Sequence, residues 1–254
     1  MSGLFLSDKM NNKTKKYGLI GKSLAHSFSK GYFTQKFADD RIDAIYENIS
    51  LSKIEAVRPV LLEDYAGCNV TIPYKEAIIP FIDELHGAAE IIQAVNTIEF
   101  KNGKTIGHNT DVFGFKQMIK PFLKSHNERA MIIGTGGAAK AVTYVLEELG
   151  VNVIHISRNP KGTHEFAYDD INENMIKFNG IIVNTTPIGM FPNVDEEVAI
   201  PYSFLNEKHL AIDLIYNPEE TLFLKNAKTQ GAWVLNGLTM LHQQAEKAWQ
   251  IWNK

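Results

Sequence analysis

The sequence is almost free of cysteine, since Cys68 is the only one among 254 residues. A single thiol provides neither a disulfide framework nor a cluster of thiolate metal ligands. The neighbourhood of Cys68 is apolar, so we expect an inert and buried thiol.

Long apolar runs and an excess of positive charge are also missing. No stretch reaches the length needed to cross a bilayer. The apolar part of residues 1–16 is too short for a signal peptide, and we expect a loose leader that ends where residues 17–21 begin. The formal net charge is -3, which argues against a nucleic-acid surface. A cytoplasmic protein with no nucleic-acid or membrane partner fits these absences.

The composition that remains is that of an ordinary globular protein. Hydrophobic residues make up 44% of the chain and charged residues 22%, so there is ample material for a core. A length of 254 residues suggests one large domain or two small ones.

Apolar and amphipathic segments alternate along the chain and predict an α/β fold. After the polar stretch 125–129, near-continuous apolar strands separated by helices indicate a parallel sheet that is covered on both faces. The expected strands are residues 16–21, 43–50, 67–72, 130–134, 151–157, 179–186 and 209–216, with a hairpin over 94–110. The expected helices are residues 29–40 with Ser29 as N-cap, 51–65, 73–85, 111–122, 138–150 and 238–252.

The segment "IIGTGGAA" places Gly134, Gly136 and Ala139 in a G-x-G-x-x-A pattern. A strand is expected before it and a helix after it, which is the context of a dinucleotide-binding turn. Gly134 permits the tight turn, Gly136 lets the backbone approach a pyrophosphate, and Ala139 lets the helix pack closely on the strand. The alternative is an ordinary glycine-rich turn.

The residues about twenty positions further on indicate the choice of cofactor. An NAD enzyme typically has an acid there that binds the ribose 2′-hydroxyl, whereas this chain has Ser157, Arg158 and Asn159. A guanidinium can bind an adenosine 2′-phosphate. The alternative is an arginine that is merely exposed on the surface. Arg158 is one of only four arginines, and its place at this position favours NADP as the cofactor.

The segment "NVTIPYKE" sets two polar side chains, Asn69 and Thr71, on alternate positions of an expected strand, and Lys75 follows at the exit. Alternate side chains share one face of a strand. That face is therefore either half exposed, with a surface lysine, or the wall of a pocket.

Further polar residues join this set on the amino-terminal side of the glycine loop: Ser27, Ser29, Asn96 and Asp111. Neutral hydroxyls and amides suit a small ligand with several hydroxyl groups and do not suit a metal. Each residue also has a structural alternative. The serines and Asp111 could cap helices, Asn96 could satisfy a turn, and Lys75 could be a solvated helix residue.

Eight motifs then occur in a fixed order: "HSFS", "NVTIPYK", "AVNTI", "GHNTD", "GTGGAAKA", "NTTPIGM", "DLIYNPEET" and "GLTMLHQQA". On these motifs the chain resembles the shikimate dehydrogenase family from about Tyr17 to its end. The resemblance implies NADPH-dependent interconversion of 3-dehydroshikimate and shikimate, a step of chorismate and aromatic amino acid biosynthesis. It also implies a substrate domain and a Rossmann-like NADP domain flanking a cleft, with a last helix that returns to the substrate domain.

The resemblance implies a role for each matched residue. The catalytic pair is Lys75 and Asp111, and the domains span residues 1–110 with 238–254 and residues 111–237. The expected substrate ligands are Ser27, Ser29, Asn69, Thr71, Asn96, Tyr216 and Gln244. The cofactor-binding residues of this prediction are Gly134, Gly136, Gly137, Ala138, Ser157, Arg158, Thr185 and Gly237, and no metal is expected.

The chain departs from the family pattern outside the catalytic pair. Lys30 stands where the family usually has proline, and Thr239 stands where glycine is common. Gly162 occupies a position that is often basic, with Lys161 before it.

A mechanism follows from the pair. Hydride reduction of a ketone makes an alkoxide, which a positioned acid must protonate. The Lys75 ammonium can stabilise that oxyanion before it gives up a proton, and Asp111 would hold the ammonium in place.

Three alternatives remain open. Quinate dehydrogenase shares the family and the chemistry, but Ser29 rather than threonine favours shikimate. A non-catalytic NADP-binding regulator would need a broken pair, and this chain has both Lys75 and Asp111. A folate-type dehydrogenase would leave "HSFS" unexplained. The sequence does not distinguish a monomer from a homodimer.

Overall fold

The computed structural model describes residues 13–25 and 27–254, so most of the expected leader and His26 of "HSFS" lie outside the described residues. The first strand, β1 (Lys15–Gly21), begins inside the expected leader. It begins there because its pairing with β2 (Ala44–Ser50) runs back to Lys15.

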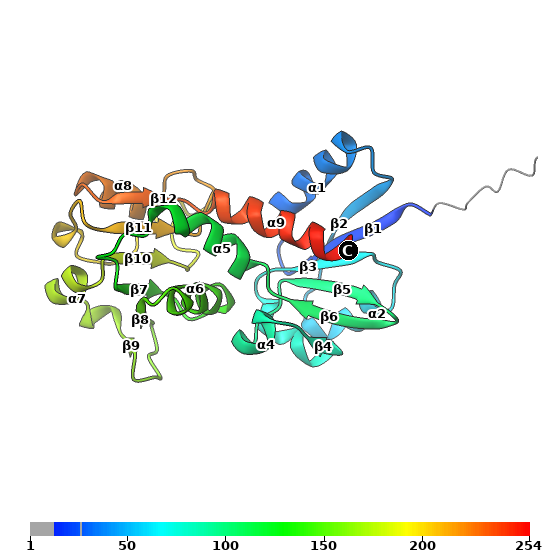
Figure 1. The fold of residues 1–254 in the computed structure, drawn as a ribbon, viewed down its shortest axis with the longest axis horizontal. Helices are drawn as coiled ribbons and strands as arrows, with labels where there is room; N and C mark the ends of the chain where they lie inside the picture. The colour runs from blue at the N-terminus through cyan, green and yellow to red at the C-terminus, as the bar shows by residue number, and fades with distance from the viewer. Residues whose placement is uncertain (1–12, 26) are drawn as a thin grey trace, which may run out of the picture.

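The described chain forms two bodies, each built on a six-stranded sheet (Figure 1). The first sheet has the order β2-β1-β3-β5-β6-β4. It is parallel from β2 to β3 and antiparallel at β3–β5 and β5–β6, where the expected hairpin forms. Its other strands are β3 (Gly67–Val70), β4 (Glu84–Leu85), β5 (Thr97–Lys101) and β6 (Lys104–His108). Its helices are α1 (Phe28–Asp39), α2 (Val57–Leu61), α3 (Tyr74–Ala77) and α4 (Ala88–Ile92).

The second sheet has the order β12-β11-β10-β7-β8-β9, and every strand pair in it is parallel. Counted from β7, this is the 3-2-1-4-5-6 order of a Rossmann sheet, so the predicted fold class is confirmed. Its strands are β7 (Arg129–Ile133), β8 (Asn152–Ile156), β9 (Glu165–Phe166), β10 (Ile181–Asn184), β11 (Leu210–Asp213) and β12 (Trp233–Leu235). Its helices are α6 (Gly137–Glu148), α7 (Glu173–Phe178) and α8 (Leu222–Thr229).

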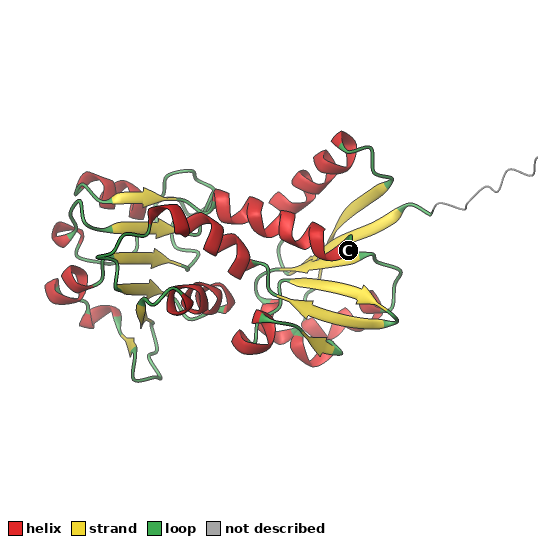
Figure 2. Ribbon diagram, in the orientation of Figure 1, coloured by secondary structure: helices red, strands yellow, loops and turns green. Residues whose placement is uncertain are grey.

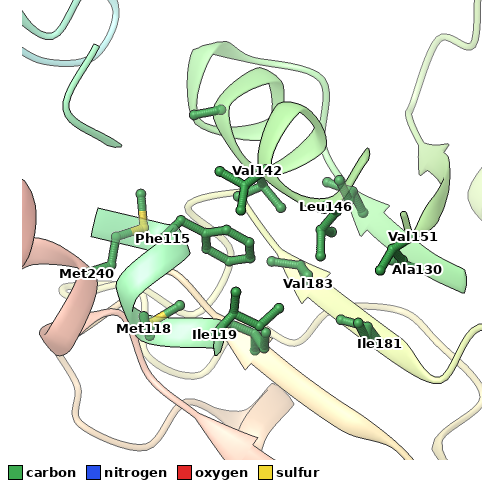
Figure 3. Close-up of a cluster of buried hydrophobic side chains, with 14 of the residues drawn as sticks. Phe115, Met118, Ile119, Ala130, Val142, Leu146, Val151, Ile181, Val183 and Met240 are labelled. Carbon is green, nitrogen blue, oxygen red and sulfur yellow. The ribbon is translucent and has the colours of Figure 1, made fainter. Parts of the chain in front are cut away.

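Two helices, α5 (Asp111–Ile119) and α9 (Leu238–Trp252), run between the two bodies (Figure 2). Figure 3 shows Phe115 and Ile119 of α5 packed with Met240 of α9 in the core of the second sheet. Further along α9, Ala245 is buried in the core of the first sheet, and the Trp252 indole donates to the Ile98 carbonyl over 2.9 Å. The last helix is therefore packed into both cores.

Three local expectations were wrong. The N-cap of α1 is Ser27, because its hydroxyl accepts the Lys30 N–H, so Ser29 lies one residue inside the helix. The expected helix 51–65 shortens to a 3-10 turn, Ile54–Ala56, followed by α2. The expected helix 73–85 ends at Ala77, and a second 3-10 turn, Ile79–Phe81, follows. Pro80 lies in that turn, and proline cannot donate the hydrogen bond that a continued helix needs.

The carboxylate of Asp213, at the end of β11, organises the loops at the edge of the second sheet. It is fully buried and accepts hydrogen bonds from the Thr221 hydroxyl at 2.6 Å, the Ile215 amide at 3.0 Å and the Asn184 amide at 3.1 Å. Burial outweighs these bonds and raises the pKa of Asp213 to about 6. The loop that this carboxylate holds carries Tyr216.

We expect this carboxyl to make the protein less stable as the pH rises from about 4 through 6. The unfolded chain ionises Asp213 at the lower pKa, so raising the pH across that window favours unfolding by on the order of 3 kcal/mol. Asp213→Asn removes the titration, and the Thr221 hydroxyl can accept from the new amide. Urea denaturation at several pH values should give a flatter pH profile for the variant. Parallel profiles for the two proteins would show that the carboxyl is not titrating in this way.

Candidate active site

Lys75 and Asp111 meet where the two bodies join. Lys75 lies in α3 of the first body, and Asp111 is the first residue of α5. The Lys75 ammonium donates to the Asp111 carboxylate over 2.6 Å. The two side chains are 16% and 7% exposed, so the pair is shielded from water and still open on the lysine side.

The backbone around Lys75 is fixed by hydrogen bonds. Its carbonyl accepts the Val95 N–H at 2.7 Å, which ties α3 to the segment before β5. Asn109, two residues before Asp111, donates to the Ala94 carbonyl and accepts the Val112 N–H. Both members of the pair are therefore fastened to residues 94–95.

Of the two polar residues Asn69 and Thr71, only Asn69 lies within β3. β3 ends at Val70, and all four of its residues are buried. The Asn69 amide accepts from the Tyr46 hydroxyl at 2.7 Å and donates to the Asn96 carbonyl and the Thr97 hydroxyl, each at 3.2 Å. Both amide hydrogens and one acceptor position of Asn69 are thus used within the protein, while Thr71 lies half-buried just beyond the strand.

Asn96 joins the same buried network. Its side-chain oxygen accepts from the Thr110 N–H at 2.7 Å, and its amide donates to the Thr110 hydroxyl at 3.0 Å. The Thr110 hydroxyl also reaches the side-chain oxygen of Gln244 on α9 at 3.4 Å. Because Thr110 precedes Asp111, this network sets the position at which α5 begins.

The two serines of "HSFS" have different surroundings. Ser27 is half-buried and caps α1. Ser29 is 9% exposed. Burial raises the pKa of Tyr46, and the nearby Ser29 hydroxyl opposes that shift. Tyr46 therefore lies between two expected substrate ligands, Asn69, to which it donates, and Ser29. The sequence gives no signal for Tyr46, because an aromatic residue in a strand is an ordinary core residue.

Tyr216 extends from the second body to the start of α1. Its ring lies against Phe28, with centroids 5.9 Å apart. Burial raises the pKa of the Tyr216 phenol, and the nearby Phe28 backbone amide opposes part of that shift. The structure thus brings Tyr216 next to Ser27 and Ser29.

The glycine loop follows β7 as the motif predicts. Gly134 has a φ of +113°, and a Cβ there would lie 2.6 Å from the Thr185 hydroxyl, so only glycine fits. Gly136 is the N-cap of α6 and provides no side-chain cap, which leaves the first amides of the helix open to a ligand. A Cβ on Gly137 would lie 3.3 Å from the Lys75 Cβ. The loop and the Lys75–Asp111 pair are therefore neighbours.

The other cofactor-side residues occupy three environments. Arg158 is exposed beyond β8, and Ser157 accepts the Asn159 N–H at 3.2 Å. Thr185 donates to the Ile133 carbonyl at 2.7 Å beneath the loop. Gly237 is the N-cap of α9.

Gly237 has a packing reason to be glycine. A Cβ there would lie 1.9 Å from the Leu214 carbonyl oxygen, and no real Cβ tolerates that distance. The close approach of the chain before α9 to the end of β11 thus requires glycine independently of any cofactor.

One ion pair beside the site was missed by the sequence analysis. Lys140 on α6 donates to Glu76 on α3 over 2.6 Å, with side chains 36% and 47% exposed. It connects the glycine-loop helix to the helix that carries Lys75. At this exposure it contributes little to stability, and only the tertiary structure shows the pairing.

Other features of the described residues lie apart from this site. Two surface hollows, of about 530 and 800 Å³, contain none of the predicted site residues. No group of three His, Cys, Asp or Glu side chains among residues 13–25 and 27–254 is arranged to hold a metal ion. In the same part of the chain, no helix has the length and apolar character required to cross a membrane.

Comparison with known proteins places this architecture in a family. A sequence profile for the shikimate dehydrogenase substrate binding domain matches residues 19–98. The chain is 37% identical over 266 residues to the shikimate dehydrogenase (NADP(+)) of Desulforamulus reducens, which covers 96% of this chain and 91% of that protein.

Two crystal structures are similar over almost the whole chain. Shikimate dehydrogenase from Aquifex aeolicus has a TM-score of 0.84 and 32% identity, covering 96% of this chain and 94% of that one. Shikimate 5-dehydrogenase from Thermus thermophilus, in complex with NADP(H) and shikimate, has a TM-score of 0.82 and 28% identity, covering 94% and 93%. With the identity to the Desulforamulus protein over 96% of the present chain, the chain belongs to the shikimate dehydrogenase family.

Proposed function

We propose that this protein is an NADP-dependent shikimate dehydrogenase that reversibly reduces 3-dehydroshikimate to shikimate, a step of aromatic amino acid biosynthesis. The observation that carries the proposal is the contact between the two halves of the site. Lys75, bonded to Asp111 at 2.6 Å, lies beside Gly137 in the predicted dinucleotide loop. A proton donor and the cofactor loop thus lie next to each other.

In this proposal, one body binds the substrate and the other binds the cofactor. Residues 1–110 with 238–254 form the substrate domain, and residues 111–237 form the NADP domain, in which the open amides of α6 and the Arg158 guanidinium hold the cofactor phosphates. NADPH supplies the hydride when bound. We further propose a cytoplasmic enzyme that acts as a monomer or a homodimer, since every proposed site residue belongs to one chain.

In the proposed mechanism, the Lys75 ammonium donates a hydrogen bond to the oxygen of the reacting ketone. That bond strengthens as negative charge grows on the oxygen, and the ammonium then gives up its proton. Asp111 keeps the ammonium oriented, and in the reverse reaction neutral Lys75 accepts the proton. Ser27, Ser29 and Thr71 orient the substrate, together with Asn96, Tyr216 and Gln244. For Asn69 only one acceptor position remains, so its proposed role is to accept a substrate hydroxyl.

The proposal is tested by following absorbance at 340 nm with shikimate or quinate, each with NADP or NAD. We expect the fastest reaction with shikimate and NADP. Turnover of quinate in preference to shikimate would favour the quinate dehydrogenase alternative. NADP binding without turnover of either substrate would favour a regulator.

Cofactor choice is expected to depend on Arg158, which is exposed and forms no ion pair among the described residues. Arg158→Ala removes a charged hydrogen-bond partner of the 2′-phosphate, which is worth roughly 1.5–3 kcal/mol. The KM for NADP should rise accordingly, and the KM for NAD should change little. Arg129→Ala is the control, because Arg129 is the first residue of β7 and lies at the edge of the sheet opposite to the glycine loop and Arg158. Equal effects of Arg158→Ala on both cofactors would refute the assignment.

Substrate binding is expected to depend on Ser27. Ser27→Ala should raise the KM for shikimate and leave the affinity for NADP unchanged. The reason is that the Ser27 hydroxyl lies at the start of α1, near Tyr216 and away from the glycine loop. Loss of the cap itself costs ~1 kcal/mol of stability. Asn172→Ala removes the comparable cap of α7 and controls for that effect. Weaker NADP binding with unchanged shikimate binding would rule the role out.

A further inference from the structure

The side chain of His155 connects Gly134, at the start of the glycine loop, to the middle of α6. His155 belongs to β8, and its Nδ1 lies 3.1 Å from the Gly134 carbonyl oxygen. Its Nε2 lies 3.1 Å from the Thr143 hydroxyl of α6. None of the eight family motifs includes His155.

The chemistry of the partners fixes the role of one ring nitrogen. A carbonyl oxygen only accepts hydrogen bonds, so Nδ1 must carry a proton and donate to Gly134. The second contact is less constrained, because the single hydroxyl hydrogen of Thr143 is shared between Nε2 and the Ala139 carbonyl at 2.9 Å. The Nδ1 bond is therefore the stronger connection.

That bond acts on a residue with little conformational choice. The N–H of Gly134 donates to the Ile156 carbonyl at 2.9 Å, so β8 holds the amide through its backbone and the carbonyl through the His155 ring. Both peptide groups around Gly134, at its φ of +113°, are thereby fixed. The orientation of these two peptide groups determines the direction in which the chain runs from Gly134 to the open amides of α6.

We propose that His155 is a positioning residue for the cofactor: its Nδ1–H holds the Gly134 carbonyl and thereby orients the loop for the pyrophosphate. The inference rests on the proposed function, because it requires that the loop binds a dinucleotide. The pyrophosphate is common to NADPH and NADH, so the effect of His155 is the same for both, unlike that of Arg158.

Four variants separate the two ring contacts. In His155→Asn the side-chain amide replaces Nδ1–H and can still donate to Gly134. In His155→Gln the side-chain amide takes the place of Nε2, so the hydrogen bond to Gly134 is lost. His155→Leu can form neither hydrogen bond. Thr143→Val removes only the hydroxyl.

The experiment is a fluorescence titration of each purified full-length protein with NADPH and with NADH. Loss of one neutral hydrogen bond corresponds to roughly a three- to tenfold weaker Kd. His155→Leu and His155→Gln should raise the Kd for both NADPH and NADH by that factor. For His155→Asn and Thr143→Val, both Kd values should stay within about twofold of the wild type. The KM for shikimate should stay unchanged in all four. Thermal midpoints establish that each variant is folded.

The outcomes distinguish this inference from the proposed function. Failure of the wild type to bind NADPH would overturn both. If the wild type binds and folded His155→Leu binds equally well, the positioning role alone is wrong. It is also wrong if His155→Asn is as weak as His155→Leu, or if only NADPH is affected.

Discussion

Replacing Lys75 with alanine is expected to lower turnover by at least ~10²–10⁴, the range for loss of a general acid. The Lys75 side chain is 16% exposed, and its stem lies against Gly137 at the start of the glycine-loop helix. A ketone held between the two bodies would accept its proton there. The loss should fall mainly on kcat, because the interaction is strongest when the oxyanion forms. Steady-state kinetics with saturating NADP and shikimate measure it.

The variant should fold and still bind NADP. The apolar core of the first body is built from other side chains, and the glycine loop belongs to the other body. Lys104→Ala is the control, because Lys104, at the turn of the β5–β6 hairpin, forms an ion pair with Glu84 of β4 at 2.5 Å and is not one of the proposed site residues. A folded Lys75→Ala protein with near-normal kcat would show that Lys75 is only a surface residue.

Asp111→Asn is the second substitution with a large expected effect. The side chain of Asp111 is 7% exposed, and its carboxylate is the anion that holds the Lys75 ammonium. With asparagine the ammonium loses its orientation, and we expect kcat to fall by on the order of 10². NADP affinity, measured by fluorescence titration, should stay within a few-fold of the wild type. A change confined to NADP binding would place Asp111 on the cofactor side instead.

Much of the second sheet could be predicted because its strands are local apolar runs. Residues 151–157, 179–186 and 209–216 each contain an observed strand, and residues 130–134 overlap β7 in four positions. Their alternation with helices leaves few topologies besides a parallel sheet. The glycine loop was predictable for the same reason, since its signal is contained in one β-turn-α segment.

The first body was less predictable because proline and capping decide its helices. Pro80 ends the helical path that residues 73–85 suggest by composition, and Ser27 competes with Ser29 for the same cap. The polar alternation of Asn69 and Thr71 did not predict where the strand ends, since β3 stops at Val70 and Thr71 lies beyond it.

Residues that act through distant contacts left no trace in the sequence pattern. Tyr46 and Asn69 are 23 residues apart, and His155 and Gly134 are 21 apart. A tyrosine or a histidine in a strand has no spacing that indicates its partner, so only the folded chain brings such pairs together.

The measurement that tests the central claim most directly is a double-mutant cycle of Lys75→Ala and Asp111→Asn, read as kcat with shikimate and NADP. If the two side chains form one proton-transfer unit, as their 2.6 Å contact suggests, the double variant should be little slower than Lys75→Ala alone. If the two losses instead multiply, so that the free energies add, Lys75 and Asp111 act independently and the account is contradicted.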